Sequence, residues 1–288
     1  MSVRPLAILS AILITSGLHA QENAAMPQAT QFLNVLYYPT NQAGLTPYQL
    51  ERCRLDIHVP RKTNEAPVLI WFHGGGLTGG SKDLPVGLKG RNIIVVSVNY
   101  RLSPKVACPA YLEDAAAAVA WTFQNIADYG GSPDKIVISG HSAGGYLALM
   151  LGLDKHWLAA HGIDANRFAG IAPLSGQCIT HLTIRKERAI DIKQPVIDAF
   201  APLFHVRADA PPILLLTGDR EKEMMGRYEE NAYLMRMLRV NGHTNNSLCE
   251  FQGYGHGMMV PGVPLLMEFI QRVTAPPPTP PVSNTTLL

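Results

Sequence analysis

Short runs of consecutive apolar residues are the feature that most restricts how this sequence can fold. The runs Val68–Phe72 and Ile213–Leu216 contain no alternating polar residues, which is typical of strands buried on both faces of a parallel sheet. Stretches with a helical pattern separate such runs, and this alternation predicts an α/β fold with a doubly wound parallel sheet and helices on both of its faces. We expect strands over residues 54–59, 68–72, 93–98, 135–139, 168–174, 213–217 and 247–251, and helices over residues 110–129, 143–153, 226–241 and 264–273.

The composition indicates one globular domain and gives no sign of a charged partner. Hydrophobic residues make up 47% of the 288 residues and charged residues only 16%, which is typical of a folded chain with a large core. The formal net charge is +2 and the basic residues are scattered, so we expect no nucleic-acid partner. We expect a single domain over residues 31–274, after a loose polar leader and before a proline-rich, disordered tail over residues 275–288.

The first 20 residues have the pattern of a secretory signal peptide. Arg4 supplies a positive charge, residues 6–14 form an apolar core, and residues 17–20 provide a plausible cleavage site. An uncleaved membrane anchor is the alternative, but the apolar run falls short of the roughly 20 residues that span a bilayer. We therefore expect residues 1–20 to be removed, the mature chain to have no stable membrane insertion, and its location to be periplasmic or secreted.

Export affects the interpretation of the four cysteines. In an oxidising compartment they could form up to two disulfides, and buried free thiols are the equally favoured alternative. Their wide spacing lacks any Cys-x-x-Cys pair, and no His/Asp/Glu cluster has metal-ligand spacing, so we expect no metal site. The four are Cys53, Cys108, Cys178 and Cys249.

A serine stands where an expected strand leads into an expected helix. The sequence Gly140-His141-Ser142-Ala143-Gly144 directly follows the apolar run 135–139. Glycines at both ends lack the Cβ atoms that would clash in so sharp a turn. The turn places Ser142 at a helix N-terminus, where amides and dipole favour negative charge, so Ser142 is a candidate nucleophile. A plain glycine-rich turn is the alternative.

A second glycine cluster, His73-Gly74-Gly75-Gly76, follows the run Val68–Phe72. Backbone N–H groups of such a loop can face a cavity without side chains in the way, which suits an oxyanion that develops during attack on a carbonyl. A phosphate-binding loop is the alternative, but no Gly-Lys-Ser/Thr follows at the required spacing. We expect the amides of Gly75, Gly76 and Ala143 to form the oxyanion hole, and His73 to brace the loop through a side-chain hydrogen bond.

A general base and an acid are expected beyond the later strands. His256 lies in the glycine-flanked loop Gly253–Gly257 after the last expected strand, and it is the candidate base. Two carboxylates, Asp219 and Glu221, follow the strand over 213–217, and either could orient the imidazole. The residues alone leave this choice open.

Together these motifs resemble the α/β-hydrolase superfamily, in particular esterases that carry both His-Gly-Gly-Gly and Gly-x-Ser-x-Gly, such as the feruloyl/acetyl-esterase-like and hormone-sensitive-lipase-like groups. The stretches Asn99–Pro104, Pro109–Trp121 and Tyr129–Ile136 are similar to the same branch. The resemblance spans roughly residues 55–270 and implies a mostly parallel sheet of about eight strands. In these families the acid usually stands three residues after the glycine that ends the strand, which implies Glu221 rather than Asp219.

The sequence therefore predicts an exported serine hydrolase that cleaves small-molecule carboxylic esters through an acyl-enzyme, without a cofactor. Hydrolysis of amides or formamides, as in the related kynurenine formamidases, is one alternative. A non-catalytic hydrolase-fold binding protein is another. Outside these roles we expect Asp114 to tie loops together as a structural carboxylate, and His141 to brace the turn around Ser142. Oligomeric state is left open.

Overall fold

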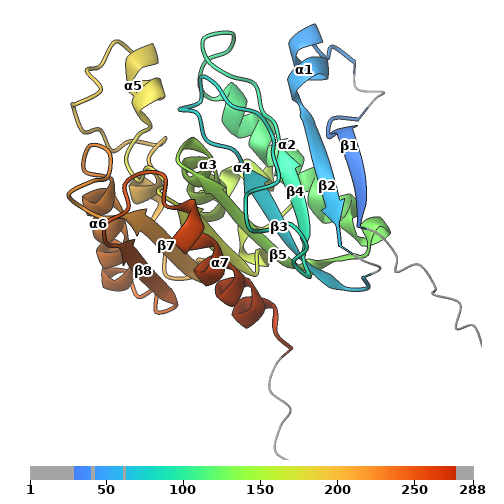
Figure 1. Cartoon of the computed structure of the whole chain (residues 1–288). Helices are drawn as coiled ribbons and strands as arrows, with labels where there is room; N and C mark the ends of the chain where they lie inside the picture. Colours follow the sequence, from blue (N-terminus) through green and yellow to red (C-terminus); the bar gives the residue numbers. More distant parts are fainter. Residues whose placement is uncertain (1–28, 40–42, 61–62, 277–288) are drawn as a thin grey trace, which may run out of the picture.

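The computed structural model describes residues 29–39, 43–60 and 63–276 of the chain. The expected signal peptide and residues 277–288 of the expected tail lie outside these ranges. The described residues build one eight-stranded sheet in the order β1-β2-β4-β3-β5-β6-β7-β8 (Figure 1). β2 pairs antiparallel with both of its neighbours, β1 and β4, and all other neighbours pair parallel. The strands are β1 (Thr30–Leu36), β2 (Arg54–Val59), β3 (Ala66–Phe72), β4 (Ile94–Val98), β5 (Gly131–His141), β6 (Gly170–Leu174), β7 (Ile213–Gly218) and β8 (Asn246–Phe251).

Helices cover both faces of this sheet, as the alternating pattern predicts (Figure 1). The helices are α1 (Pro47–Arg52), α2 (Ala110–Asn125), α3 (Ala143–Leu153), α4 (His156–Ala159), α5 (Leu182–Glu187), α6 (Arg227–Val240) and α7 (Met259–Thr274), with short 3₁₀ turns η1 (Ile126–Tyr129), η2 (Ala165–Arg167) and η3 (Pro202–His205). The expected α/β-hydrolase fold with helices on both faces of a mostly parallel sheet is confirmed.

The core has two parts because side chains of a strand alternate between the faces of the sheet. Ile70 and Phe72 of β3 belong to the larger cluster, which α2, α3 and α6 cover. Leu69 and Trp71 of the same strand belong to the smaller cluster, which α7 covers. Burial on both faces explains why the central strands lack alternating polar residues.

The seven expected strands all form, each with bounds within a few residues of the expected ones. The structure adds β1, which begins where the expected polar leader ends and for which the sequence analysis predicted no strand. Most of β1 is exposed, and it pairs with β2 alone at the edge of the sheet. Its apolar residues form two short pairs, Phe32-Leu33 and Val35-Leu36, separated by Asn34, so no continuous apolar run marks the strand.

Two expected helices differ in their ends. The stretch 110–129 divides into α2 and the 3₁₀ turn η1, and α7 begins at Met259, five residues before the expected start at Pro264. The short helices α1, α4 and α5 were not expected, because each has only four to six residues and too few turns to show an amphipathic pattern.

All four cysteines are free thiols, which favours the second of the two alternatives. Cys53 and Cys178 are buried, and burial raises the pKa of both thiols. None of the helices in the described ranges is long and apolar enough to cross a membrane.

The parallel strands determine where a site can lie. Because β3 and β5–β8 are mutually parallel, the loops that follow their carboxyl ends meet at one edge of the sheet. This edge receives the glycine loop after β3, Ser142 after β5, and the loops after β6, β7 and β8.

Candidate active site

Ser142 occupies a sharp turn between β5 and α3. Its backbone φ is 57° and its ψ is −114°, a conformation that side-chain-bearing residues rarely adopt. The turn is secured on both sides, since Ser142 N–H donates to the carbonyl of Leu174 at 2.8 Å and its own carbonyl accepts the amide of Tyr146 at 3.0 Å. The strained residue is therefore fixed at the N-terminus of α3, as the sequence predicts.

The two flanking glycines are required by close backbone contacts. A Cβ atom on Gly140 would lie 2.5 Å from the carbonyl carbon of Gly144 and 2.6 Å from the carbonyl oxygen of Phe72. A Cβ atom on Gly144 would collide with the same carbonyl of Phe72 and would lie 2.8 Å from that of His73. The turn can therefore press against the end of β3 only when both positions lack side chains.

The glycine loop after β3 lies beside Ser142. A Cβ atom added to Gly74 would be 3.5 Å from the Cβ of Ser142. Gly75 and Gly76 have φ values of 107° and 65°. The amides of Gly75, Gly76 and Ala143 donate no hydrogen bond to any other residue in the described ranges, and all three lie at this edge of the sheet. They are therefore available to bind an oxyanion.

The loop is braced by His73 and by a contact from α5. The Nδ1–H of His73 donates to the carbonyl of Gly74 at 2.7 Å, and its ring stacks on Tyr100 with centroids 4.4 Å apart. Burial lowers the pKa of His73 to about 4, so its imidazole is neutral at neutral pH. The Thr183 hydroxyl donates to the carbonyl of Gly76. The expected structural role of His73 agrees with this geometry.

His256 reaches the Ser142 turn through its neighbour His141. The Nε2–H of His141 donates to the carbonyl of His256 at 2.7 Å, and the two ring centroids are 4.7 Å apart. Burial lowers the pKa of His141, so it serves as a neutral brace for the turn. No hydrogen bond joins Ser142 to His256 among the described contacts; in unliganded enzymes such bonds are often long and tighten only when substrate is bound.

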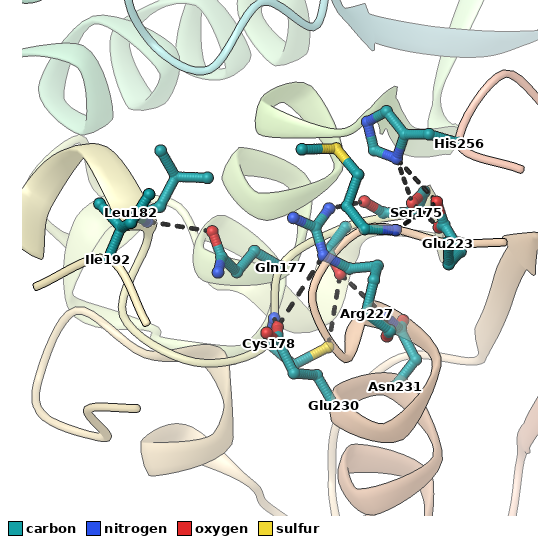
Figure 2. Close-up of polar contacts among 12 residues, drawn as sticks. Ser175, Gln177, Cys178, Leu182, Ile192, Glu223, Arg227, Glu230, Asn231 and His256 are labelled. Atoms are coloured by element: carbon teal, nitrogen blue, oxygen red, sulfur yellow. Dashed lines mark hydrogen bonds and ion pairs between the residues drawn. The ribbon is translucent and has the colours of Figure 1, made fainter. Parts of the chain in front are cut away.

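The carboxylate that pairs with His256 is Glu223, which corrects the expectation of Glu221 or Asp219. The Nδ1 of His256 lies 2.9 Å from Oε1 of Glu223, whose side chain is only 1% exposed (Figure 2). Burial alone would raise the pKa of Glu223, but hydrogen bonds from His256 and Ser175 outweigh it and hold that pKa below its ordinary value. Glu223 is therefore ionised, and it holds the hydrogen of His256 on Nδ1, which leaves Nε2 free to accept a proton.

The two expected acids have other places. Asp219 accepts the amides of Glu221 at 2.9 Å and Gly253 at 2.8 Å, and so joins the loop after β7 to the loop after β8. Glu221 is exposed, and its carboxylate makes no hydrogen bond or ion pair with the described residues. The reason is a helical turn, in which the amide of Glu223 donates to the carbonyl of Asp219 at 2.8 Å and the chain turns Glu223 inward.

A sequence signal for Glu223 does exist. Glu221 stands between Arg220 and Lys222, whereas Glu223 is followed by the apolar pair Met224 and Met225. A carboxylate at the boundary between charged and apolar residues is a candidate for burial, but the sequence analysis did not consider Glu223.

Ser175 is a site residue that the sequence analysis did not identify. It follows β6, is fully buried, and places its hydroxyl between Glu223 and Nδ1 of His256 (Figure 2). Behind it the buried Arg227 of α6 donates through Nη1 to the carbonyl of Ser175, and Asn231 donates to that of Gly176 at 2.9 Å. The first turn of α6 therefore holds the chain that carries Ser175.

A cavity of about 580 Å³ lies between the segment 179–195 and the start of α6. Two of its lining residues are close in sequence to the site: Met225 follows Glu223 by two residues, and Ile179 follows Ser175 by four. The lining combines apolar and charged side chains, which suits an organic group with polar substituents. It consists of Ile179, Arg185, Ile192, Lys193, Pro195, Met225, Gly226, Glu229 and Glu230.

Asp114 has the structural role that the sequence analysis expects. Its buried carboxylate accepts three hydrogen bonds from Arg101, through the backbone amide and the guanidinium, and a fourth from the Tyr38 hydroxyl. No group of three or more His, Cys, Asp or Glu residues in the described ranges is arranged to hold a metal ion.

Comparison with solved structures places the fold. A truncated carbohydrate esterase from gut microbiota superimposes with a TM-score of 0.71 at 19% identity, over 88% of this chain and 99% of the other. Esterase 2 of Thermogutta terrifontis in its apo form superimposes with a TM-score of 0.66 at 21% identity, over 88% and 98% of the two chains. At these identities the likeness shows the α/β-hydrolase fold.

Comparison with curated sequences and family models identifies the family of this chain. Esterase LipQ of Mycobacterium tuberculosis is 32% identical over 213 residues, which are 66% of this chain and 50% of LipQ. Carboxylesterase NlhH of the same species is 39% identical over 97 residues, 32% of this chain and 30% of NlhH. The matched region thus spans half or less of these relatives. The family model BD-FAE matches residues 55–232, more than half of the 288 residues, and the chain therefore belongs to the BD-FAE family.

Proposed function

We propose that this protein is a carboxylic ester hydrolase with a triad of Ser142, His256 and Glu223. The observation that carries the proposal is the buried Glu223–His256 pair, with its 2.9 Å contact, held against a strained serine turn beside three available amides. The names of the curated relatives, which are esterases and carboxylesterases, support ester hydrolysis and imply small-molecule ester substrates.

The proposed reaction consists of proton transfers through His256 that accompany each bond change. The Ser142 hydroxyl gives its proton to Nε2 of His256 as its oxygen bonds to the ester carbonyl carbon. The carbonyl oxygen becomes an oxyanion, which the amides of Gly75, Gly76 and Ala143 stabilise. His256 returns the proton to the departing alcohol, the C–O bond breaks, and an acyl-enzyme is left. A water molecule then repeats the sequence and releases the acid.

Glu223 stabilises the imidazolium that forms during both steps. Its carboxylate stays ionised because its pKa lies below the ordinary value, and it remains a hydrogen-bond acceptor throughout. Because their pKa values are lowered, His73 and His141 are neutral and add no positive charge near the base. His256 is thus the histidine placed to cycle between its two protonation states.

The test is a Ser142→Ala variant measured on p-nitrophenyl acetate. We expect kcat to fall by about 10⁴-fold or more, because the variant lacks the hydroxyl that forms the acyl-enzyme. A fluorophosphonate probe should label Ser142 in the unaltered protein. Ser139→Ala is the matched control, since Ser139 lies on the same strand and its buried hydroxyl donates to the carbonyl of Ala172 at 2.5 Å. Ester hydrolysis retained by Ser142→Ala would refute the proposal.

The same assay separates the alternatives of amide hydrolysis and simple binding. Short-chain p-nitrophenyl esters and aryl formamides are compared at equal concentration. Faster turnover of the formamide would assign amide hydrolysis to the same triad. Labelling of Ser142 without turnover of either substrate class would favour a binding protein.

We also propose that the chain is exported and that residues 1–20 are removed. The support is the sequence pattern of a basic start, an apolar core and a small residue at position 20. N-terminal sequencing of the protein recovered from the periplasm or medium checks it. Recovery in the cytoplasm with Met1 intact would contradict it.

A further inference from the structure

A buried serine completes the acid end of the site. The Ser175 hydroxyl donates to Oε2 of Glu223, and its oxygen lies 3.0 Å from Nδ1 of His256. The Nδ1 also lies 2.9 Å from Oε1 of Glu223, so the three side chains form a closed ring of contacts (Figure 2). The proposed proton transfers do not require this hydroxyl, and its position needs a separate explanation.

The hydroxyl satisfies the carboxylate oxygen that His256 does not reach. Glu223 uses Oε1 for the imidazole and Oε2 for Ser175. A carboxylate that is 1% exposed cannot obtain a replacement partner from bulk water, and a buried acceptor without a donor is costly. Ser175 therefore fixes the rotation of the carboxylate and favours its ionised form.

The backbone holds Ser175 in this position. Its φ is +50°, and its amide donates to the carbonyl of Leu216 at 2.7 Å. Its carbonyl accepts Nη1 of Arg227. The preceding residue, Leu174, accepts the amide of Ser142. One stretch of two residues thus contacts the nucleophile turn through its backbone and the acid–base pair through a side chain.

We propose that Ser175 is a positioning residue, whose hydroxyl orients the Glu223 carboxylate and through it the imidazole of His256. The inference rests on the proposed function, in which these two side chains are the acid and the base. The other charged or titratable groups close to this ring are Arg227, which enters from α6, and His141, which lies on the Ser142 turn.

Loss of the hydroxyl has a definite effect on protonation. Ser175 draws negative charge towards Oε2, so without it more charge remains on Oε1 beside His256. The pKa of the imidazole rises, and the pKa of the desolvated carboxylate rises as well. Since the pair titrates together, the acid limb of the kcat/KM profile moves to higher pH. A purely structural role for Ser175 would leave that limb in place.

The experiment compares Ser175→Ala and Ser175→Gly with the unaltered full-length chain. Glycine tolerates the positive φ, so it removes the hydroxyl without adding backbone strain. We expect kcat to fall roughly 10- to 100-fold in both variants with KM changed by less than about twofold. The acid limb should rise by about half a pH unit or more. Ser97→Ala is the matched control, because Ser97 lies on β4 and its buried hydroxyl donates to the backbone carbonyl of Asp83, away from this ring.

A second measurement does not depend on turnover. NMR titration of His256 in the substrate-free protein should show a higher pKa in Ser175→Ala than in the unaltered chain. An unchanged pKa, an unmoved acid limb, or full activity of Ser175→Gly would overturn the role of Ser175. Absence of ester hydrolysis in the unaltered chain would instead refute the proposed function, and the NMR titration would still decide whether the hydroxyl controls His256.

Discussion

The two halves of the candidate site are built in different ways. The nucleophile half, which comprises the Ser142 turn and the glycine loop 73–76, is defined by backbone contacts. For example, a Cβ atom added to Gly140 would lie 2.6 Å from the carbonyl oxygen of Phe72. The acid half, which comprises Ser175 and the loop 219–226, is defined by side-chain contacts around Glu223 and His256. In the first half the glycines cannot vary, whereas in the second the position of the carboxylate depends on how the loop turns.

This difference determines how each half can be disturbed. A backbone-defined half is disturbed by added atoms, since a methyl group meets a carbonyl that cannot move. A side-chain-defined half is disturbed by removed atoms, since each carboxylate oxygen and each ring nitrogen has one specific partner. Substitutions of both kinds therefore test whether the division holds.

Among the substitutions that test this division, the largest effect is expected from Glu223→Gln. The amide cannot stabilise an imidazolium and it favours the wrong tautomer of His256, so kcat should fall by about 10³- to 10⁴-fold. Glu221→Gln is the matched control, because Glu221 is exposed and carries the same side chain two residues away. Its rate should stay within about twofold. Steady-state kinetics on p-nitrophenyl acetate compares the two, and the reverse ranking would return the acid role to Glu221.

The same division explains how much the sequence could predict. Ser142, the glycine loop and seven of the eight strands follow from glycines and apolar runs, which record backbone packing directly. The carboxylate beside His256 was not predicted, because Asp219, Glu221 and Glu223 lie within five residues and the helical turn at 219–223 directs Glu223 inward. Ser175 was missed for a related reason, since its partners lie 48 and 81 residues away along the chain.

The nucleophile half is tested by adding one methyl group. In Gly75→Ala the new Cβ would lie 2.6 Å from the carbonyl carbon of Gly79, and φ is 107°, so the loop must shift. We expect kcat to fall by about 10²-fold, the usual cost of losing one oxyanion donor. Gly90→Ala also has a positive φ but no neighbour within 4 Å of its Cβ, so it should lower stability by about 1–2 kcal/mol and leave kcat unchanged. Equal kinetics for the two variants would show that backbone collision does not matter at Gly75.

His181, the N-cap of α5, connects stability to pH. It is 1% exposed, and burial, followed by the charges of Arg227 and Arg185, lowers its pKa to about 3. The unfolded chain binds a proton here near the ordinary value of 6.5 and the folded chain does not. The contribution of the neutral His181 to the free energy of unfolding is therefore fully present above pH 6.5. It decreases by about 1.4 kcal/mol per pH unit as the pH falls towards 3.

His181→Asn isolates this dependence. Asparagine retains an oxygen that can accept the Thr183 amide at the start of α5, as Nδ1 of His181 does at 3.2 Å, but it does not titrate. Urea unfolding at pH 7, 6 and 5 should show a smaller loss of stability at acid pH in the variant than in the unaltered chain. His73 titrates in both proteins and cancels in the comparison. Equal slopes for the two proteins would mean that His181 is protonated when folded.

The smallest effect is expected from Asp219→Asn, which loosens the acid half without removing the acid. Hydrogen bonds from the amides of Gly253 and Glu221 lower the pKa of Asp219, so its carboxylate acts as a loop brace. An asparagine oxygen can replace one of these acceptors but not both, and the loop that carries Glu223 gains freedom. We expect kcat on p-nitrophenyl acetate to fall by less than about tenfold, with the acid limb of the pH profile in place. A loss as large as that of Glu223→Gln would show that Asp219 shares the acid role. The acid half would then depend on a network of two carboxylates, and the contrast between its side-chain construction and the backbone construction of the nucleophile half would become sharper.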